Sequence, residues 1–580
     1  MILQALYDYY HRCDDLPRKG MELKEIGFLI VIDKDGHFLR FEDRRIDKKQ
    51  AQKFLVKKHV GRTSALAANY LYDNSGYVFG YSDKGDVMAQ YQTFKEKVNS
   101  IFESHLDNSD IKAVHMFYQQ EQSEILNQMQ KDVRWPEIEK CLNKKYSTFS
   151  FLIEGDTRIV AEKEELLDLS IDYDDIIGVN QICLVSGKRG RAVETTTATM
   201  IPGSQATAKL VAFQVSSGYD SYGKSKGGNA PISEEAEFAY TTALNHLLES
   251  NSRNKFMIGS RTFLFWASKN NEVGQKAEDG FFNLFGFNDQ EDDPNKKIEQ
   301  VRKVFEAIYK GSLKTTSEDI FYILGLAPNA ARIAVTYWAE IPLCKFAETI
   351  CRHFNDMEVV DNRLEKKPYM SLRSMVSAVT LGGKVSDATP NLPEFVAKSI
   401  FEGLPYPHTL FASCVRRIRA ENSKDKYEEA FRKGYIVTRA AILKAYLNRI
   451  NNNQTKIQVM LDKDNTNQGY LCGRLFAVLD KIQEEANNQH SIRERYMNSA
   501  SSTPAAVFST ILNLSNHHFD NLKSEGRKIY FEKLKQEIIS KIDANGFKAQ
   551  LDLQDQGRFF IGYYHQRQDF FTKNEENNNE

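Results

Sequence analysis

The residues 186–232 have the composition of a phosphate-binding segment. This stretch holds seven glycines, six lysines or arginines and only two acids. Glycine lets a backbone approach a ligand closely, and neighbouring N–H groups and cationic side chains can then point at one anion. The cations are Lys188, Arg189, Arg191, Lys209, Lys224 and Lys226. The sequence therefore predicts that this stretch contacts phosphate.

Within it, residues 218–225 (GYDSYGKS) match the Walker A pattern of nucleotide hydrolases letter for letter. Such a loop needs a strand before it and a helix that begins at the Gly-Lys-Ser, because the helix N-terminus binds the phosphates. Residues 209–215 predict the strand. The sequence GGNAP at 227–231 would stop any helix within its first turn. The pattern therefore favours the phosphate of a nucleic acid over that of ATP.

Other residues capable of catalysis are scattered along the chain. The seven cysteines include no Cys-x-x-Cys pair, which argues against a zinc site and a disulfide framework and fits a reducing compartment. His517 and His518 with Asp520 are similar to a metal-nuclease pair, but no other carboxylates cluster around them. We expect no cofactor, no metal and no catalytic centre. The alternative left open is a P-loop-like NTPase or a metal-dependent nuclease that acts on nucleic acid.

A second cationic segment occupies residues 40–62, where nine lysines or arginines accompany three acids. Amides and tyrosines follow at once in 69–74 (NYLYDN) and 77–81. One interpretation is a solvated helix face followed by a core strand. The other is a nucleic-acid-binding surface, because charge is interleaved with asparagine and tyrosine.

The composition predicts a soluble cytoplasmic protein with several cores. At 580 residues the chain is long enough for roughly three or four compact units. Apolar residues at 41% exclude global disorder, and a net charge of −1 means that anion binding must come from local patches. The N-terminus carries acids where a signal peptide would be apolar, and no apolar run approaches the length of a membrane span.

The pattern of elements predicts the α+β class, with antiparallel hairpins and mixed α/β parts followed by an all-helical C-terminal bundle. An Asp-Gly turn predicts a hairpin over 26–42, and Ser233 is a suitable N-cap for a helix through Leu248. The remaining expected strands are 149–154, 182–186, 257–267, 320–326 and 332–338. The remaining expected helices are those within 84–150, at 161–169 and 296–310, from Pro342, and throughout the chain after Leu392.

A linker rich in Gly, Asn and Asp at 269–295 predicts the clearest internal boundary. We therefore expect an N-terminal region over 1–268, for which the resemblance given below implies DNA recognition, and a central region over 269–459. A helical bundle over 460–573 and a disordered tail over 574–580 complete the division.

Short motifs along the whole chain carry a resemblance. They are MILQALYDYY at 1–10, RTS at 62–64 with NYLYDN at 69–74, GSQ at 203–205, SYGK at 221–224 with NAP at 229–231, EEAEFAYTTALN at 234–245, FWA at 265–267, GRLFAVL at 473–479, SASSTP at 499–504, and QG at 556–557 with GYYHQR at 562–567. In this order they resemble the large subunit of the type I-C CRISPR surveillance complex (Cascade).

That resemblance implies a non-catalytic role: recognition of the protospacer-adjacent motif in duplex DNA, help in opening the duplex, and recruitment of a helicase-nuclease. The implied partners are a guide RNA complex with backbone and RNA-processing subunits and target double-stranded DNA, without a membrane. It matches the logic of guided recognition, in which base pairing reads the sequence and the protein reads a short motif.

Roles for individual residues follow as hypotheses. Phosphate contacts are expected from Lys57, Lys58 and Arg62. Amides that read base edges are expected at Asn69, Asn74 and Gln205, because an amide both donates and accepts. We expect the nucleic-acid backbone near the motif, or that of the displaced strand, to be held by Lys188, Arg189, Arg191 and Lys224.

The resemblance also suggests a use for the terminal bundle, which is similar to the separate small subunit that type I-C genes produce by internal translation. Met460 stands just before the bundle and is one of two methionines in the last 200 residues. We hypothesise that a fragment beginning near Met460 is made and lines the complex.

Overall fold

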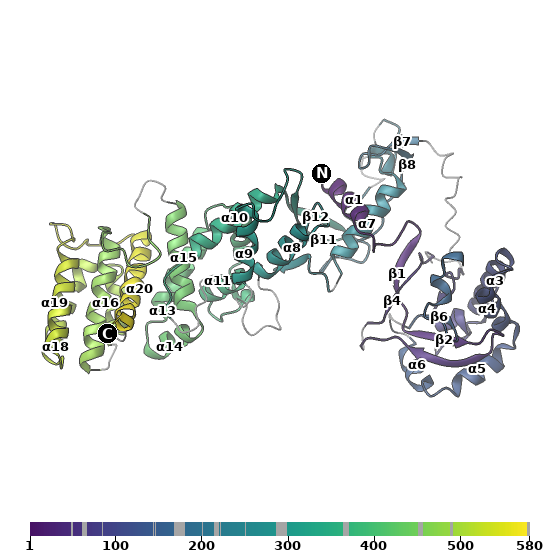
Figure 1. Ribbon diagram of the computed structural model, residues 1–580, viewed down its shortest axis with the longest axis horizontal. Coiled ribbons are helices and arrows are strands. Elements are labelled where there is room, and N and C mark those ends of the chain that lie inside the picture. Colours follow the sequence, from purple (N-terminus) through teal and green to yellow (C-terminus); the bar gives the residue numbers. More distant parts are fainter. Residues whose placement is uncertain are drawn as a thin grey trace. The chain divides into compact units, whose positions relative to one another are not determined.

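The computed structural model describes residues 1–47, 50–60, 66–83, 85–142, 144, 147–166, 180–199, 201–213, 220, 222–249, 251–285, 298–362, 370–450, 456–487 and 491–576 (Figure 1). The fold is α+β, as predicted, with small sheets in the N-terminal and central parts and helices in the C-terminal part. The chain divides into two compact units. The smaller unit comprises Cys13–Thr195 and Gln214–Ala243, and the larger unit comprises Met1–Arg12, Thr196–Phe213 and Leu244–Glu580.

A four-stranded sheet of order β3-β2-β6-β5 forms the core of the smaller unit. Its two central strands are apolar and buried along their whole length, so helices must connect and cover them. The predicted hairpin is confirmed as β2 paired with β3, and the predicted helices within 84–150 are confirmed (Figure 1). The elements are β2 Phe28–Ile32, β3 Phe38–Asp43, β5 Tyr72–Asp73, α2 Ser75–Val78, α3 Met88–Ser104, α4 Ser109–Gln119, α5 Gln122–Gln130, α6 Trp135–Cys141 and β6 Phe149–Ile153.

A separate two-stranded ribbon pairs β1 (Met21–Glu25) with β4 (Lys53–Lys57) in antiparallel register. The predicted helix face within 40–62 is wrong, because the described residues of this segment form the end of β3, a turn bridged from Arg45 to Ala51, and β4. Lys48, Lys49 and 61–65 lie outside the described residues.

Three further predictions are corrected. The acidic stretch 161–169 forms two short 3-10 turns, Val160–Glu162 and Glu164–Leu166, and its remainder lies outside the described residues. The strand expected at 182–186 is β7 (Asn180–Ile182), which ends as the chain turns toward β8 (Arg189–Arg191). The strand expected at 209–215 is reduced to one bridge between Lys209 and Arg332, with 214–215 outside the described residues.

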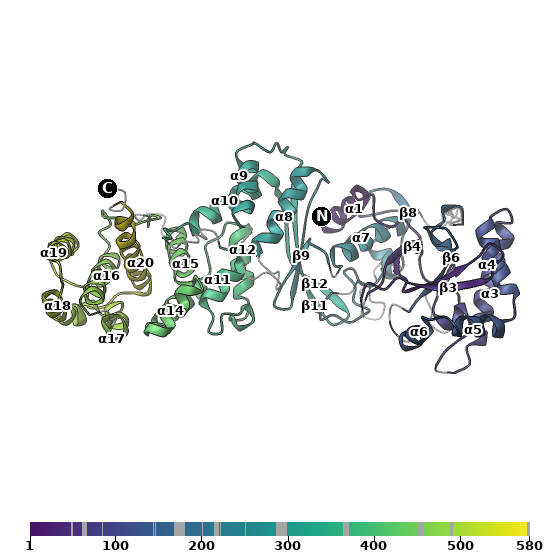
Figure 2. The ribbon, with the colours of Figure 1, turned by 60° about the horizontal axis from the view of Figure 1, so that its bottom comes forward.

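The larger unit contains a second antiparallel sheet of order β12-β11-β10-β9 (Figure 2). The single strand expected at 257–267 is two strands, β9 (Lys255–Ile258) and β10 (Arg261–Ala267), separated by a turn at Gly259. The predicted pair of later strands is confirmed as β11 (Ile320–Asn329) and β12 (Arg332–Pro342).

The two faces of this sheet are covered by different helices. Phe265 packs against Phe281 of α8 (Glu272–Phe285), with ring centres 4.8 Å apart. Trp266, the next residue of β10, lies 6.2 Å from Tyr9 of α1 (Ile2–Arg12). Alternate residues of a strand point to opposite faces, which explains the division. The helix α8 occupies most of the region where the sequence predicts a linker, and α9 (Ile298–Tyr309) and α10 (Leu343–Met357) confirm two predicted helices.

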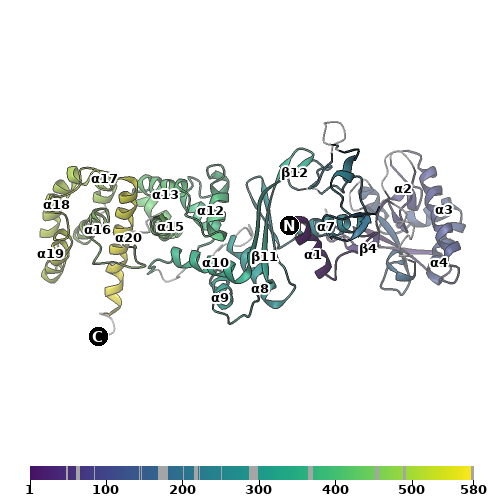
Figure 3. The ribbon, with the colours of Figure 1, turned by 90° about the horizontal axis from the view of Figure 1, so that it is seen from above.

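After α10, the regular elements in the described residues are all helical (Figure 3). The sequence predicts this for the chain after Leu392. The elements are α11 Leu372–Val379, α12 Leu392–Phe401, α13 His408–Ala420, α14 Lys424–Arg432, α15 Tyr435–Ile450, α16 Gln468–Asn487, α17 Ser491–Ala500, α18 Pro504–Asp520, α19 Glu525–Ile539 and α20 Leu553–Glu576. Pro504 opens α18, as the sequence predicts.

The central pair of this helical region is α16 and α20, which pack with their backbones in contact. A Cβ atom on Gly473 of α16 would lie 1.9 Å from the carbonyl oxygen of Phe559 in α20, so only glycine fits there. The helix α20 also packs against α15. It reaches Glu576, which corrects the expected start of a disordered tail at 574, and 577–580 lie outside the described residues. The division into regions 1–268, 269–459 and 460–573 stays a prediction.

No helix in the described ranges has both the length and the apolar character needed to cross a bilayer.

Candidate nucleic-acid interface

The hairpin of β7 and β8 in the smaller unit presents three exposed cations. Lys188, Arg189 and Arg191 all lie on its surface. The turn is closed by Cys183, whose backbone N–H donates to Lys188 (2.9 Å) and whose carbonyl accepts from Gly187 (2.9 Å). Arg191 lies 3.6 Å from Glu234, at the start of α7 (Glu234–Leu247), so this guanidinium has a weak internal partner. Ser233 accepts from the N–H of Ala236 (3.3 Å), which confirms the predicted N-cap.

The side chain of Cys183 fastens this hairpin to the segment before α7. Its buried sulfur accepts N–H bonds from Val185 (3.4 Å), Ser186 (3.5 Å) and Ser233 (3.2 Å). Burial opposes the thiolate, but the bonds from Ser186 and Ser233 outweigh it and lower the pKa of Cys183 to about 7. The N–H of Leu184 also donates to the carbonyl oxygen of Pro231 (2.9 Å). The exposed cations therefore stand on a fixed support.

The glycine-rich loop beside the hairpin folds around Asp220. Its Oδ1 accepts from the N–H of Lys226 (3.1 Å) and from Nδ2 of Asn229 (3.0 Å). A Cβ atom on Gly227 would lie 1.8 Å from the carbonyl oxygen of Val193, so a larger residue would separate loop from hairpin.

A P-loop hydrolase would begin a helix at this point. Residues after Lys224 instead form one 3-10 turn, Lys226–Asn229, which confirms that a long helix does not follow. Lys224 is exposed. Gly218, Tyr219 and Ser221 of the Walker-like stretch lie outside the described residues.

Most of the described arginines in the 40–62 segment are neutralised internally. Arg40 pairs with Glu154 (2.6 Å), and Arg44 pairs with Glu42 (2.6 Å). Arg45 sits between Asp43 and Glu137, 2.5 Å from each, and these carboxylates raise the pKa of Arg45 further. An arginine held by two acids adds little to an anion-binding surface.

Lys57 and Lys58 lie at the end of β4. The ammonium group of Lys57 lies 4.3 Å from the centre of the Tyr70 ring, a cation–π contact. The hydroxyl of Tyr72 donates to the carbonyl oxygen of Lys57 (2.8 Å), which fixes the end of the strand. Lys58 is exposed. Arg62 lies outside the described residues.

The three predicted base-reading amides have different surroundings. Asn69 is only 8% exposed, and its Oδ1 accepts the N–H of Val60 (2.9 Å), so it is better placed to hold the loop than to read bases. Asn74 is exposed, but its Oδ1 caps α2 by accepting from Gly76 (3.0 Å). Gln205 is exposed and belongs to the larger unit, where its N–H donates to the carbonyl oxygen of Ala330 (3.3 Å).

The structure thus places the predicted cations in two groups of the smaller unit. Lys188, Arg189, Arg191 and Lys224 belong to the hairpin and its loop, whereas Lys57 and Lys58 belong to the β1–β4 ribbon.

The sequence interpretation missed three exposed apolar side chains beside these cations. Ile182 and Leu184 of the hairpin are 59% and 58% exposed, and Tyr222 of the loop is fully exposed. Tyr222 also has a φ of 53°, an uncommon value for a residue other than glycine. The sequence did contain a signal for the exposure of Tyr222. Its neighbours in 220–225 (DSYGKS) are polar residues and glycine, which offer no apolar contacts to a buried tyrosine.

Metal-ligating side chains do not gather in groups of three or more within the described ranges. His518 lies 3.3 Å from Nε2 of Gln483 and 3.1 Å from Nδ2 of Asn487, so amides surround it rather than carboxylates.

Comparison with known proteins gives one match that spans almost the whole chain. The family model described as CRISPR-associated protein (Cas_Csd1) covers residues 6–571. No curated protein matches the chain. The extent of the family match agrees with the resemblance carried by the short motifs. The chain therefore belongs to the Cas_Csd1 family of CRISPR-associated proteins.

Proposed function

We propose that this chain is the non-catalytic large subunit of a type I-C RNA-guided surveillance complex, and that it recognises the protospacer-adjacent motif and helps to open the DNA. Membership of the CRISPR-associated family supports the class of function. The observation that carries the proposal is the β7–β8 hairpin, which exposes Lys188, Arg189 and Arg191 and is fastened through Cys183 to Ser233. Exposed cations on a fixed hairpin are suited to a phosphate backbone.

Within this function each group of residues has a separate task. Lys57, Lys58 and Lys224 add phosphate contacts, while Asn74 and Gln205 are the exposed amides available for base edges. Asn69 positions the loop before them. Tyr222, Ile182 and Leu184 supply apolar surface that can press between unstacked bases, as minor-groove wedges do.

The partners follow from the same proposal. They are the guide RNA with its backbone and RNA-processing subunits, target double-stranded DNA, and a helicase-nuclease. A small subunit translated internally from near Met460 is part of the proposal as well.

The salt dependence of DNA binding tests the role of the hairpin. Replacing Lys188, Arg189 and Arg191 together by alanine should weaken binding of the assembled complex to duplexes that contain the motif. Each lost phosphate contact should make the negative slope of log K against log salt shallower by about 0.9. A matched control replaces Lys303 of α9, Lys310 just after that helix, and Lys345 of α10, which are also exposed. An unchanged slope in a mobility-shift titration of the hairpin variant would reject the assignment.

A further inference from the structure

A cavity of about 350 Å³ lies among α14, α15, α17 and α20 of the larger unit, far from the proposed DNA-binding hairpin in sequence. Its volume falls in the range of small-molecule sites. Four aromatic rings and three arginines line it, together with one acid. The lining residues are Tyr427, Glu428, Phe431, Arg432, Ile436, Val437, Arg493, Tyr564, Arg567, Gln568 and Phe571.

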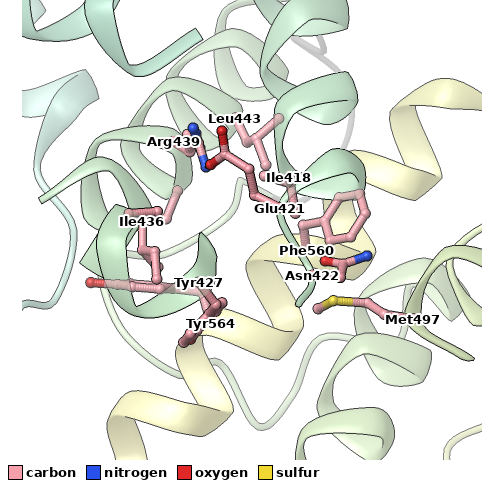
Figure 4. A pocket seen from close by; sticks show the side chains of 12 residues that line it. Ile418, Glu421, Asn422, Tyr427, Ile436, Arg439, Leu443, Met497, Phe560 and Tyr564 are labelled. Atoms are coloured by element: carbon pink, nitrogen blue, oxygen red, sulfur yellow. The ribbon is translucent and has the colours of Figure 1, made fainter. Parts of the chain in front are cut away.

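A smaller apolar pocket of about 40 Å³ adjoins this cavity and shares Tyr427, Ile436 and Tyr564 with it (Figure 4). In the close-up, Tyr427 belongs to α14 and Tyr564 to α20 (Figure 4). The two tyrosines line both the small apolar space and the larger cavity.

The arginines of the larger cavity are held in place by groups behind its wall. Arg493 is 2% exposed, and its guanidinium lies 3.9 Å from the centre of the Tyr427 ring. Its Nε donates to the carbonyl oxygen of Asn422 (3.4 Å). Arg567 donates to Glu484 (2.7 Å) and lies 3.7 Å from Asp480.

Burial would lower the pKa of Arg567, but Tyr563 and the carboxylates of Asp480 and Glu484 more than offset this and raise it. Arg567 is thus already paired with two carboxylates, and Arg493 is buried against Tyr427. Arg432 is the exposed arginine of this wall, and a guanidinium can bind phosphate oxygens through two parallel N–H donors.

The rim of the cavity combines aromatic surface with a cation. Phe431 of α14 is 44% exposed, and Phe571 of α20 is 49% exposed. Arg432, next to Phe431, is exposed as well. These two phenylalanines give the rim exposed aromatic faces, and aromatic rings of this kind stack on nucleobases.

We propose that this cavity binds a nucleotide, with the base against the aromatic residues and the phosphate on Arg432. A nucleotide offers the two features that the walls can recognise, an aromatic face and a phosphate. A base alone would leave Arg432 without an anion, and inorganic phosphate would leave the aromatic rim empty. The nucleotide can be free or can belong to a single strand that passes the rim. The site is distinct from the proposed motif-reading hairpin and requires no protospacer-adjacent motif.

Isothermal titration of the full-length chain with adenosine monophosphate, adenosine and inorganic phosphate tests the chemistry. The monophosphate should bind at one saturable site, at least tenfold more tightly than adenosine or phosphate alone. A ten-nucleotide deoxyadenosine strand forms the second arm. If the strand binds tightly and the monophosphate does not, the ligand is a nucleotide within single-stranded nucleic acid.

Matched variants assign the binding to this cavity. Phe431→Ala and Arg432→Gln should each weaken binding about tenfold or more. Phe395→Ala in α12, 51% exposed, and Lys433→Gln, the exposed neighbour of Arg432, should leave it within twofold of the unmodified chain. All four positions are at the surface, so the variants should fold, which a thermal melt checks.

Two results would overturn the inference: saturable binding of neither the monophosphate nor the strand, or equal weakening by the control variants. The alanine variant of Lys188, Arg189 and Arg191 should bind the monophosphate normally. A negative result for nucleotide binding in the cavity would not contradict the motif-recognition proposal, because that proposal is tested by duplex DNA binding of the assembled complex.

Discussion

The Oδ1 atom of Asn69 accepts a hydrogen bond from the backbone N–H of Val60 at 2.9 Å, so the residues on either side of 61–65 are tied together. The backbone N–H of Asn69 in turn donates to Oδ2 of Asp73 (3.0 Å). Asp73 pairs with Phe149 at the edge of the central sheet of the smaller unit. A single buried amide thereby links the cationic end of β4 to the core.

Asn69→Ala should lower the free energy of unfolding by about 1–3 kcal/mol, because the N–H of Val60 loses a buried acceptor. It should also weaken duplex binding of the assembled complex, since Val60, which follows Lys58 and His59, then loses its hydrogen bond to Asn69. Urea denaturation and a mobility-shift titration measure the two effects. Asn251→Ala, at an exposed position, is the control. Loss of DNA binding without loss of stability would instead indicate that Asn69 contacts DNA directly.

Gly473→Ala should destabilise the larger unit by roughly 1–3 kcal/mol or more, because the new Cβ would overlap the carbonyl oxygen of Phe559. A Cβ atom on Gly526 of α19 would lie 3.7 Å from its nearest neighbour, the hydroxyl oxygen of Ser524. Gly526→Ala should therefore be neutral or slightly stabilising, since alanine is the better helix former. Thermal unfolding of the two variants compares them directly. Equal midpoints would contradict the close approach of α16 and α20.

Tyr222→Ala should reduce opening of the duplex, because stacking of one base on an aromatic ring contributes about 1–3 kcal/mol. A 2-aminopurine base placed next to the motif reports unstacking through its fluorescence. Tyr222→Phe retains the ring and should retain the signal. Tyr309→Ala, at a half-exposed tyrosine of α9, controls for loss of an aromatic side chain elsewhere. A full signal from Tyr222→Ala would remove this residue from the proposed wedge.

Met460→Leu should abolish a C-terminal product that begins at this position while leaving the full-length chain intact. Met460 is 62% exposed, so its replacement should not disturb folding. An immunoblot against a C-terminal tag detects both products. Met497→Leu conserves volume at a buried position and should leave the short product in place. Persistence of that product in the Met460 variant would place its start elsewhere.

Acidification should destabilise the protein through two buried histidines. Burial lowers the pKa of His565 to about 3, and burial together with Arg449 lowers the pKa of His353 to about 3. Both stay neutral in the folded chain while the unfolded chain protonates them near pH 6.5, so their contribution is complete above pH 6.5 and is lost toward pH 3. At pH 5.5 the loss is about 1.4 kcal/mol for each.

Urea unfolding at pH 7.5 and 5.5 measures this loss. His565→Gln removes the titrating group and keeps a polar side chain near the hydroxyl of Tyr470, which lies 3.0 Å from His565. The variant should lose about half of the pH dependence that the two histidines cause. An unchanged dependence would show that His565 is protonated in the folded chain.

Local signals in the sequence predict local structure well. The Asp-Gly turn at Gly36 and the cap at Ser233 each act within a few residues, and both form as expected. In the described part of the strand expected at 209–215, only Lys209 is bridged, and its partner Arg332 is distant in the sequence. Strand formation depends on such distant partners, which a pattern along the chain does not reveal.

The candidate site shows the same division. The cations of the hairpin are exposed as their composition predicts, whereas Asn69 is buried by contacts from Val60 and the core. The pairing of Arg45 with Glu137 could not be predicted from the sequence either, because the two residues are more than ninety positions apart. Residue type indicates what a side chain can bind, and only the fold decides whether an internal partner has already taken it.

The path of the chain through its two units has a consequence for synthesis. Tyr9 of α1 packs against Trp266, so the first helix must wait for β10, while α20, the last helix, packs against α15 and α16. At roughly 5–20 residues per second, α1 spends many seconds without its sheet. The whole of Cys13–Thr195 is made during that wait and can begin folding first. The larger unit is therefore completed only after α20 has been synthesised.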